Sequence, residues 1–442
     1  MKSNNQNLWS FTASLAGFLF GFDTVVISGA NLPIKELWDT SPLFHGTFIM
    51  SMALWGTVVG SLLGGIPSQR LGRKNTLIWI GALYFISAVG SGLAPDPYSF
   101  SFFRFIGGLG VGASTVAGPM YISEISTPKN RGRLVALYQF NIVLGILIAF
   151  FSNYLLKGFD GANDWRWMLG IEGLPAAIYF VSVFFIPKSP RWLITERKDE
   201  DGAREVLERM GVEDVEGEIQ QIEDAEKIEE KSDESFFTKY KKPLILAFLI
   251  AFFNQLSGIN FVLYYAPEIL EIAGLAAKES LFNSIAIGGI NLLFTFVGMY
   301  LIDRAGRRQL LIIGSIGYIA SLLMIALSFY ADLGAGVLLM SIMAFISSHA
   351  VGQGAIIWAF IAEIFPNHAR AFGTSWGTGT HWIFAALITL LGPVVIDIFK
   401  ENPWPIFVIF AGTMVFQLLF ALFMMPETKG VSLEDIQKKL GI

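Results

Sequence analysis

Five side-chain amides lie inside long apolar runs of this 442-residue chain, and their chemistry is the most specific in the sequence. An amide both donates and accepts hydrogen bonds, and in an apolar environment it is costly unless the protein or a bound molecule satisfies it. A neutral site for a molecule with many hydroxyl groups, such as a sugar, needs amides of this kind together with an aromatic surface. The amides are Gln139, Asn254, Gln255, Asn260 and Asn291, and the nearby aromatic residues are Tyr264, Tyr265, Trp358 and Trp382.

Two opposite charges, Asp23 and Arg104, also lie well inside apolar runs. Ionisable residues within membrane-spanning segments are rare and by default functional, and these two are natural partners for each other. Burial favours the neutral acid, whereas a nearby guanidinium favours the carboxylate. This balance suits a carboxyl group that binds and releases a proton, and a static buried ion pair is the alternative.

The elements that position these residues must be membrane helices. Hydrophobic residues make up 53% of the chain and charged residues only 15%, a balance that ordinary soluble domains do not have. Each apolar run is long enough for the roughly 20 residues that a membrane-spanning helix needs. We therefore expect an all-α membrane protein with twelve spans. The runs begin near Leu8, Phe48, Thr76, Phe100, Leu134 and Trp167, and then near Leu244, Leu281, Leu310, Ala335, Phe372 and Trp404.

Composition also excludes several functions. The chain has no cysteine, which rules out disulfides, thiolate metal sites and cysteine catalysis. The net charge of -5 arises mainly between Lys188 and Lys242, where about 28 charges sum to about -6, so no basic patch is present for nucleic acid. No metal-ligand cluster, nucleophile elbow or phosphate loop is apparent. We expect no enzyme activity, no metal and no cofactor.

Charges in the connections predict the orientation of the chain. Arginine and lysine are concentrated in the loops that follow even-numbered helices, so both termini are expected in the cytoplasm. The segment 188–242 has apolar residues at helical spacing, which predicts short amphipathic helices on the cytoplasmic face. A flexible acidic linker is the alternative. The apolar positions are Val206, Leu207, Met210, Ile219, Ile222 and Ile228.

Three motifs recur at nearly one offset. RLGRKNTL at Arg70 returns as RAGRRQLL at Arg304, about 234 residues later. EISTPKNRG at Glu124 returns as EIFPNHARA at Glu363, and PKSPR at Pro187 as PETKG at Pro426, each about 239 residues later. These matches indicate a duplicated six-helix unit, as in parallel-repeat transporters. We expect six-helix bundles at 1–187 and 243–425, the linker at 188–242 and a cytoplasmic tail at 426–442.

The same motifs carry a family resemblance along essentially the whole chain. GFDTVVISGA at Gly21, RLGRK, PMYISEISTPKNRG at Pro119, PKSPRW, NQLSGIN at Asn254, DRAGRR at Asp303 and PETKG resemble, in order and spacing, the signatures of the sugar porter family. This resemblance implies the major facilitator fold, with twelve helices in two halves joined by a cytoplasmic helical linker. It also implies transport of a sugar by alternating access.

The resemblance assigns roles to individual residues. Gln139, Gln255, Asn260 and Asn291 match positions that hydrogen-bond the sugar, Trp358 matches the stacking tryptophan, and Phe20 matches an aromatic residue of the cavity. Three departures affect the expected substrate. Asn254 stands where the family has a second glutamine, GQGAIIW before the tryptophan lacks prolines that help break the helix, and His381 replaces an amide beside Trp382. We expect Tyr264, His381 and Trp382 in the same site, with packing or gating as the alternative for the aromatic residues.

A second set of charges lies at helix ends in both halves. In the family, such residues form salt bridges between the halves when the cavity faces outward, and inward opening breaks them. The alternative is that these charges only determine topology. Within this set Glu124 is expected to pair with Arg131. The expected cytoplasmic latch comprises Arg70, Arg73, Glu124, Arg131, Arg304, Arg307, Glu363 and Arg370.

Together these features predict a proton-coupled importer of a hexose or pentose that works as a monomer in the lipid bilayer of the plasma (inner) membrane. The acid at Asp23 favours a symporter, because many uniporters of the family have a neutral residue there. A facilitative sugar uniporter with the same pocket is the closest alternative. A transporter-like sugar sensor is the alternative from another class.

Overall fold

The computed structural model describes residues 2–127, 130–227, 236–431 and 433–440. Its contacts divide the chain into two compact units. Unit 1 consists of Met1–Thr24, Trp55–Ile146 and Leu169–Asp233, and unit 2 of Val25–Leu54, Leu147–Met168 and Glu234–Ile442. Every regular element in the described residues is helical.

The helices of the first repeat begin close to the predicted positions. Two of its spans are interrupted, the second at Ser51 and the sixth at Ile171 and Glu172. The elements are α1 (Lys2–Leu37); α2 (Pro42–Phe44), η1 (His45–Met50) and α3 (Met52–Leu63); α5 (Arg73–Leu93); α6 (Pro97–Glu124); α7 (Arg131–Leu156); and α8 (Asp164–Gly170) with α9 (Gly173–Val183).

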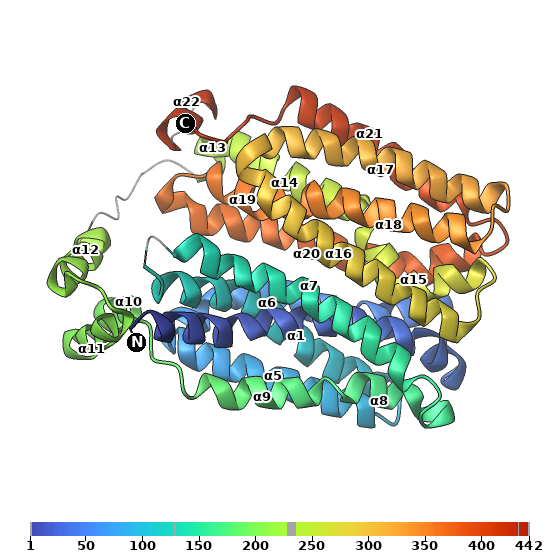
Figure 1. Cartoon of the computed structure of the whole chain (residues 1–442), viewed down its shortest axis with the longest axis horizontal. Helices are drawn as coiled ribbons and strands as arrows, with labels where there is room; N and C mark the ends of the chain where they lie inside the picture. The colour runs from blue at the N-terminus through green and yellow to red at the C-terminus, as the bar shows by residue number, and fades with distance from the viewer. Residues whose placement is uncertain (1, 128–129, 228–235, 432, 441–442) are drawn as a thin grey trace. The chain divides into compact units, whose positions relative to one another are not determined.

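The second repeat has the same order and lies in unit 2 (Figure 1). Its first and fourth spans are each broken into two helices. The elements are α14 (Lys241–Leu256) with α15 (Ile259–Ile272), α16 (Ala277–Ala305), α17 (Arg307–Tyr330), α18 (Ala335–Val351) with α19 (Gln353–Glu363), α20 (Asn367–Ile398) and α21 (Trp404–Phe423).

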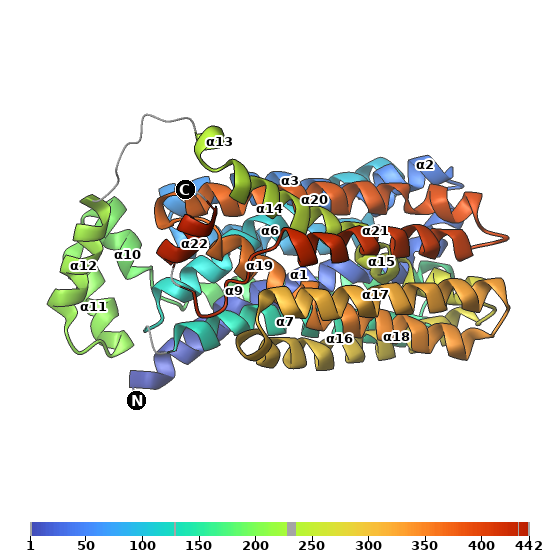
Figure 2. The ribbon, with the colours of Figure 1, turned by 90° about the horizontal axis from the view of Figure 1, so that it is seen from above.

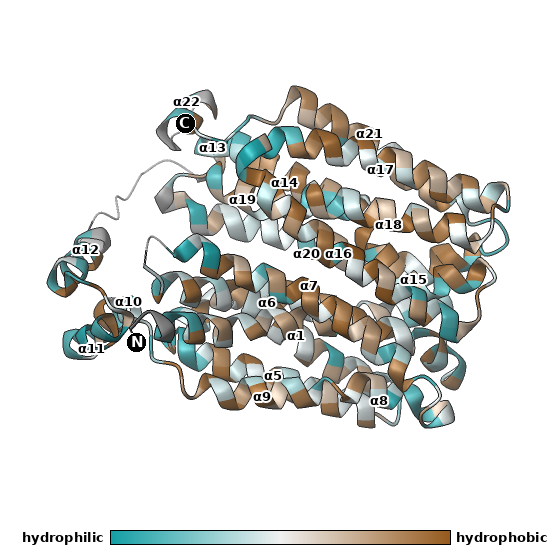
Figure 3. Ribbon diagram, in the orientation of Figure 1, coloured by the Kyte–Doolittle hydropathy of each residue, from teal (hydrophilic) through white to brown (hydrophobic). Residues whose placement is uncertain are grey.

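Length and hydropathy show a multi-pass membrane protein. Within the described residues, ten helical spans are long and apolar enough to cross a membrane, and the bent pair Pro42–Met50 and Met52–Leu63 makes an eleventh. The shorter helices α8 and α9 lie where the sixth span is predicted. Hydrophobic residues follow α17, α18 and α21 over their length, and many large apolar side chains on these helices are exposed (Figure 3). Such surfaces require lipid around them.

Glycines let α1 and α7 pack with their backbones in contact inside unit 1. A Cβ atom on Gly21 would lie 1.8 Å from the carbonyl oxygen of Ile142, and one on Gly145 would lie 2.1 Å from that of Phe18. Only residues without a side chain allow this approach, which is the packing that membrane helices favour. These contacts set the position of the segment of α1 that carries Asp23.

The charged segment forms short amphipathic helices that belong to unit 1, as predicted. The segment contains α10 (Pro190–Trp192), η3 (Leu193–Arg197), α11 (Glu200–Met210) and α12 (Val215–Lys227), which gather in Figures 1 and 2. Val206, Leu207, Met210 and Ile219 are buried among them and Ile222 packs against them, whereas Ile228 lies outside the described residues. The indole of Trp192 donates to the carbonyl oxygen of Gln69 (2.6 Å), which fastens this segment to the first repeat.

Unit 2 joins segments from both repeats. Its first-repeat segments, Val25–Leu54 and Leu147–Met168, pack on second-repeat helices. A Cβ atom on Gly46 would lie 1.9 Å from the carbonyl oxygen of Leu390, and the rings of Tyr154 and Phe282 are 5.4 Å apart. The compact units therefore differ from the sequence repeats, and the domain boundaries at 187, 242 and 425 stay a prediction.

Candidate functional site

Breaks in two helices of unit 2 lie beside the predicted sugar-binding residues. The chain leaves the helical path between α14 and α15 at Ser257 and Gly258, where Gly258 has φ +82°. A second break separates α18 from α19 at Gly352. Helix breaks free backbone groups that can be tolerated only inside protein or at a cavity. The fourth span of this repeat is thus broken even though its sequence lacks the prolines common in the family.

Five predicted residues form a connected cluster at these breaks. The Gln255 side-chain amide donates to Oδ1 of Asn254 (2.9 Å) and lies 3.1 Å from Nε2 of His381. The His381 ring contacts the rings of Trp358 and Trp382, with centroids 4.9 Å and 4.8 Å apart. Oε1 of Gln255 is buried and has no hydrogen-bond partner among the described residues. This acceptor is available to a hydroxyl group.

Two glutamines that were not predicted support this cluster. Gln353, at the start of α19, accepts from Asn254 (3.4 Å) and donates to Gln417 of α21 (2.9 Å), which in turn donates to the hydroxyl of Ser315 (2.9 Å). Gln353 and Gln417 are fully buried. Both are amides inside apolar runs, so the reasoning applied to Gln139 would also have identified them.

The remaining predicted sugar-binding residues are distributed over both units. Asn260 and Tyr264 are buried in α15, and Asn291 is buried in α16, all within unit 2. Phe20 on α1 and Gln139 on α7 belong to unit 1 and are half-buried. The contacts of each group are therefore described only within the unit to which its residues belong.

Unit 1 contains a buried cluster of three ionisable side chains. Arg104 donates through Nη1 to the carboxylate of Asp23 and through Nη2 to the Asp23 carbonyl oxygen (3.1 Å). Glu172, in the break between α8 and α9, lies close enough to Asp23 and Arg104 to interact electrostatically with both. All three side chains are at most 2% exposed. The predicted Asp23 and Arg104 pair is present, and Glu172 adds a second acid.

The cluster has two carboxyl groups and one guanidinium. The guanidinium of Arg104 can neutralise only one of the two carboxylates. A second carboxylate would be an uncompensated buried charge, which costs several kcal/mol. The cluster is therefore neutral when it holds one proton. Glu172 was not predicted, although its place in an apolar run is the same signal that identified Asp23.

The charges at the helix ends form matching sites in the two repeats. In unit 1, Arg73 donates to Oε1 of Glu124 (2.8 Å), and the hydroxyl of Ser189 donates to Oε2 of Glu124 (2.5 Å). In unit 2, Arg307 donates to Oε1 of Glu363 (2.8 Å), and the hydroxyl of Thr428 donates to Oε2 (2.6 Å). The three repeated motifs thus meet at one site in each repeat.

Other members of the expected latch differ from the sequence interpretation. Glu124 pairs with Arg73 and not with Arg131, which is exposed, because the turn before α5 brings Arg73 to the end of α6. Arg70 and Arg304 are also exposed, and Arg370 donates to the carbonyl oxygen of Ala362 (2.9 Å). The pairs described lie within one unit each, and their role as a latch stays a prediction.

Glu427 completes the site in the second repeat. Burial alone would raise the pKa of its carboxyl group, but backbone N–H groups of Lys429, Arg307, Arg308 and Thr428 donate to it and hold the pKa below its usual value. These donors include the first residues of α17, where a carboxylate is favoured by the helix dipole. Gly306, which precedes α17, has φ +93°, as Gly72 before α5 has φ +89°.

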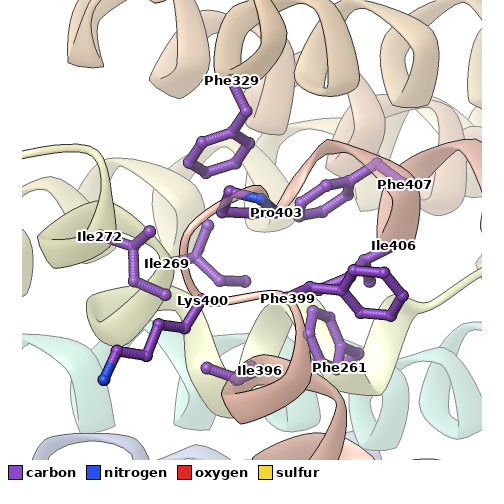
Figure 4. Close-up of a pocket in the computed structure, with 10 residues that line it drawn as sticks. All are labelled: Phe261, Ile269, Ile272, Phe329, Ile396, Phe399, Lys400, Pro403, Ile406 and Phe407. Carbon is purple, nitrogen blue, oxygen red and sulfur yellow. The ribbon is translucent and has the colours of Figure 1, made fainter.

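A small apolar pocket lies elsewhere in unit 2. It is lined by Phe261, Ile269, Phe329, Phe407 and other apolar residues, with Lys400 at one side (Figure 4). None of the predicted sugar-binding residues lines it. Its walls lack the hydrogen-bonding groups that a sugar needs. Within the described residues, no group of three or more His, Cys, Asp or Glu side chains could hold a metal ion.

Comparisons with known proteins agree with this arrangement. A family model described as "Sugar (and other) transporter" matches residues 9–440. The chain is 36% identical to the arabinose-proton symporter of Bacillus subtilis, over 98% of this chain and 94% of that protein. It is 29% identical to the D-xylose-proton symporter of Escherichia coli, over 98% of this chain and 96% of that protein.

Solved structures show the same fold. A partially occluded inward-open structure of the xylose transporter XylE from E. coli superposes with a TM-score of 0.87 at 28% identity, covering 97% of this chain and 100% of that chain. The fold, the repeated motifs and the family match agree over nearly the whole chain. The chain therefore belongs to the sugar transporter family and has the major facilitator fold.

Proposed function

We propose that this protein imports a monosaccharide together with a proton by alternating access. The observation that carries the proposal is the buried cluster of Asp23, Glu172 and Arg104, which has one carboxyl group more than its guanidinium can neutralise. A facilitative transporter has no need for a buried acid that must hold a proton. The relatives named as arabinose-proton and D-xylose-proton symporters support this reading.

The cluster couples a proton to sugar if its geometry changes between conformations. In the arrangement described, Arg104 neutralises one carboxylate and the second carboxyl group is protonated. If rocking of the helices separates Arg104 from Asp23, or admits water, the affinity for the proton changes. Any sugar that favours one conformation then shifts the proton equilibrium by the same coupling free energy.

The sugar is proposed to bind at the amide cluster of unit 2. The free Oε1 of Gln255 accepts a sugar hydroxyl, while its amide nitrogen is held by Asn254 and His381. Trp358 offers an apolar surface to the ring of the sugar. Asn260 and Asn291, also in unit 2, supply further amides, and Tyr264 and Trp382 complete the wall. For Gln139 and Phe20 of unit 1, the family resemblance alone supports a role in binding sugar.

The protein is further proposed to act as a monomer in the plasma (inner) membrane with both termini cytoplasmic. The support is the concentration of arginine in loops after even-numbered helices. In this orientation the pairs Arg73–Glu124 and Arg307–Glu363 are cytoplasmic. These ion pairs hold together the helix ends at which a cytoplasmic latch would form.

Uptake into proteoliposomes tests the function. We expect wild-type protein to accumulate a labelled pentose or hexose above the external concentration only under an inward proton gradient. A panel of unlabelled sugars in counterflow identifies the preferred substrate. Equal uptake with and without the gradient would leave a facilitative uniporter, and no exchange of any sugar in the panel would overturn the sugar assignment.

A further inference from the structure

A chain of buried polar side chains joins the two repeats in unit 2, at the end of the helices remote from the chain termini. Asn31 of α1 donates through Nδ2 to Oε2 of Glu268 on α15 (2.7 Å). Oδ1 of Asn31 is 2.8 Å from Nε2 of His45, and Nδ1 of His45 is 2.8 Å from the hydroxyl of Thr40. Asn31 and His45 are 2% and 0% exposed, and Glu268 is 9% exposed.

The chemistry of the four groups fixes the direction of every hydrogen bond. Asn31 presents its amino group to the carboxyl oxygen of Glu268 and its oxygen to His45, and an amide oxygen can only accept. His45 must then carry its proton on Nε2, which leaves Nδ1 to accept from Thr40. The result is a one-way series in which Thr40, His45 and Asn31 donate in turn towards Glu268. Lys35, also on α1, adds an attractive charge near that carboxylate.

The series ends on a helix segment that follows a break in its membrane span. Glu268 lies on α15, which is set off from α14 by the break at Ser257 and Gly258. Ten helical residues place Glu268 about 15 Å from Gly258, so a rotation of about 10° there moves its carboxylate by about 2.5 Å. That displacement takes the 2.7 Å contact with Asn31 beyond hydrogen-bonding distance.

We propose that Thr40, His45, Asn31 and Glu268 form a latch that holds the outer ends of the two repeats together, and that α15 releases it by pivoting at Gly258. The name "outer" rests on the proposed orientation. The close contact of Gly46 with Leu390 lies next to His45, so the first-repeat side of the latch is seated on α20. Releasing Glu268 leaves the side-chain amino group of Asn31 without its acceptor unless water enters, which makes the latch a two-state contact.

The chain has no cysteine, so pairs of introduced cysteines can report this movement without background. Spin labels at Glu36→Cys on α1 and Ile272→Cys on α15 are placed on exposed positions near the two sides of the latch. Pulsed EPR on full-length protein in liposomes, without sugar, gives the ratio of long to short distances. We expect the short distance to dominate in the otherwise unmodified protein.

Three substitutions distinguish the effect of the latch hydrogen bond from the effect of lost side-chain packing. Asn31→Ala and Glu268→Leu each remove the hydrogen bond between Asn31 and Glu268, and each should raise the ratio of long to short distances about tenfold. Glu268→Gln retains an acceptor for Asn31 and should have a smaller effect. The matched control is Asn153→Ala, because Asn153 is equally buried and donates to the carbonyl oxygen of Val26, within the first repeat (3.0 Å).

The outcomes are distinct from those of the transport test. A distance distribution of Asn31→Ala and Glu268→Leu equal to that of Asn153→Ala would overturn the latch, whether or not sugar is transported. A shift in both variants supports the latch even if wild-type protein fails to accumulate sugar. If Asn31→Ala does not fold, Glu268→Leu against Glu268→Gln decides the question with the same readout.

Discussion

Neutralising Asp23 and Glu172 singly and together should have strongly non-additive effects on stability. Asp23→Asn leaves Glu172 to become the carboxylate that pairs with Arg104, and Glu172→Gln leaves the Asp23 pair intact. Each single substitution therefore loses hydrogen-bonding free energy of about 1 kcal/mol. The double substitution leaves a buried guanidinium without a carboxylate, which costs about 3–5 kcal/mol. The interaction free energy is then at least about 1 kcal/mol beyond the sum.

Thermal unfolding in detergent, followed by the fluorescence of the eleven tryptophans, measures this cycle. We expect apparent Tm values within about 2 °C of wild type for the single variants and a decrease of about 5 °C or more for the double variant. Glu279→Gln, at an exposed acid, is the control for loss of a negative charge. Additive decreases would show that Glu172 does not replace Asp23 as the partner of Arg104, and the proton-sharing argument would fail.

Three further predictions test the site and the repeats. Gln139→Ala and Asn260→Ala should each weaken sugar binding by about 1–3 kcal/mol, measured by calorimetric titration; unchanged affinity in both would place the site elsewhere. His381→Asn should change the order of preference in a sugar competition panel while proton coupling stays intact, and an identical panel would assign the ring to packing. Gly72→Ala should destabilise the protein by about 1–2 kcal/mol because of its positive φ, whereas Gly65→Ala, which meets no atom within 4 Å, should not; equal Tm values would contradict this.

Much of the fold could be predicted because hydropathy and repetition are local properties of the sequence. The apolar runs gave the spans, and the recurring motifs gave the duplication. The break at Gly352 shows the limit of motif reasoning, since the helix is interrupted without the prolines that help to break it in the family. Close backbone contacts, such as that of Gly46 with Leu390, join segments that are far apart in the chain. No local sequence pattern predicts them.

The sequence predicted most of the residues of the candidate site, but it did not predict all of the hydrogen bonds and ion pairs between them. Asp23 and Arg104 were identified because two charges in apolar runs need each other, yet Glu172 satisfies the same criterion and was missed. The partner of Glu124 could not be predicted, because Arg73 and Arg131 are both close to helix ends in sequence. Only the position of α5 beside α6 selects Arg73.

The most direct test of proton coupling is acidification driven by sugar alone. Proteoliposomes that contain a pH-sensitive dye receive an inward gradient of the preferred sugar, with no imposed pH difference. We predict that the lumen acidifies with wild-type protein and not with Asp23→Asn or Glu172→Gln, although both variants still exchange labelled sugar in counterflow. Entry of sugar through the wild-type protein without acidification would contradict the account.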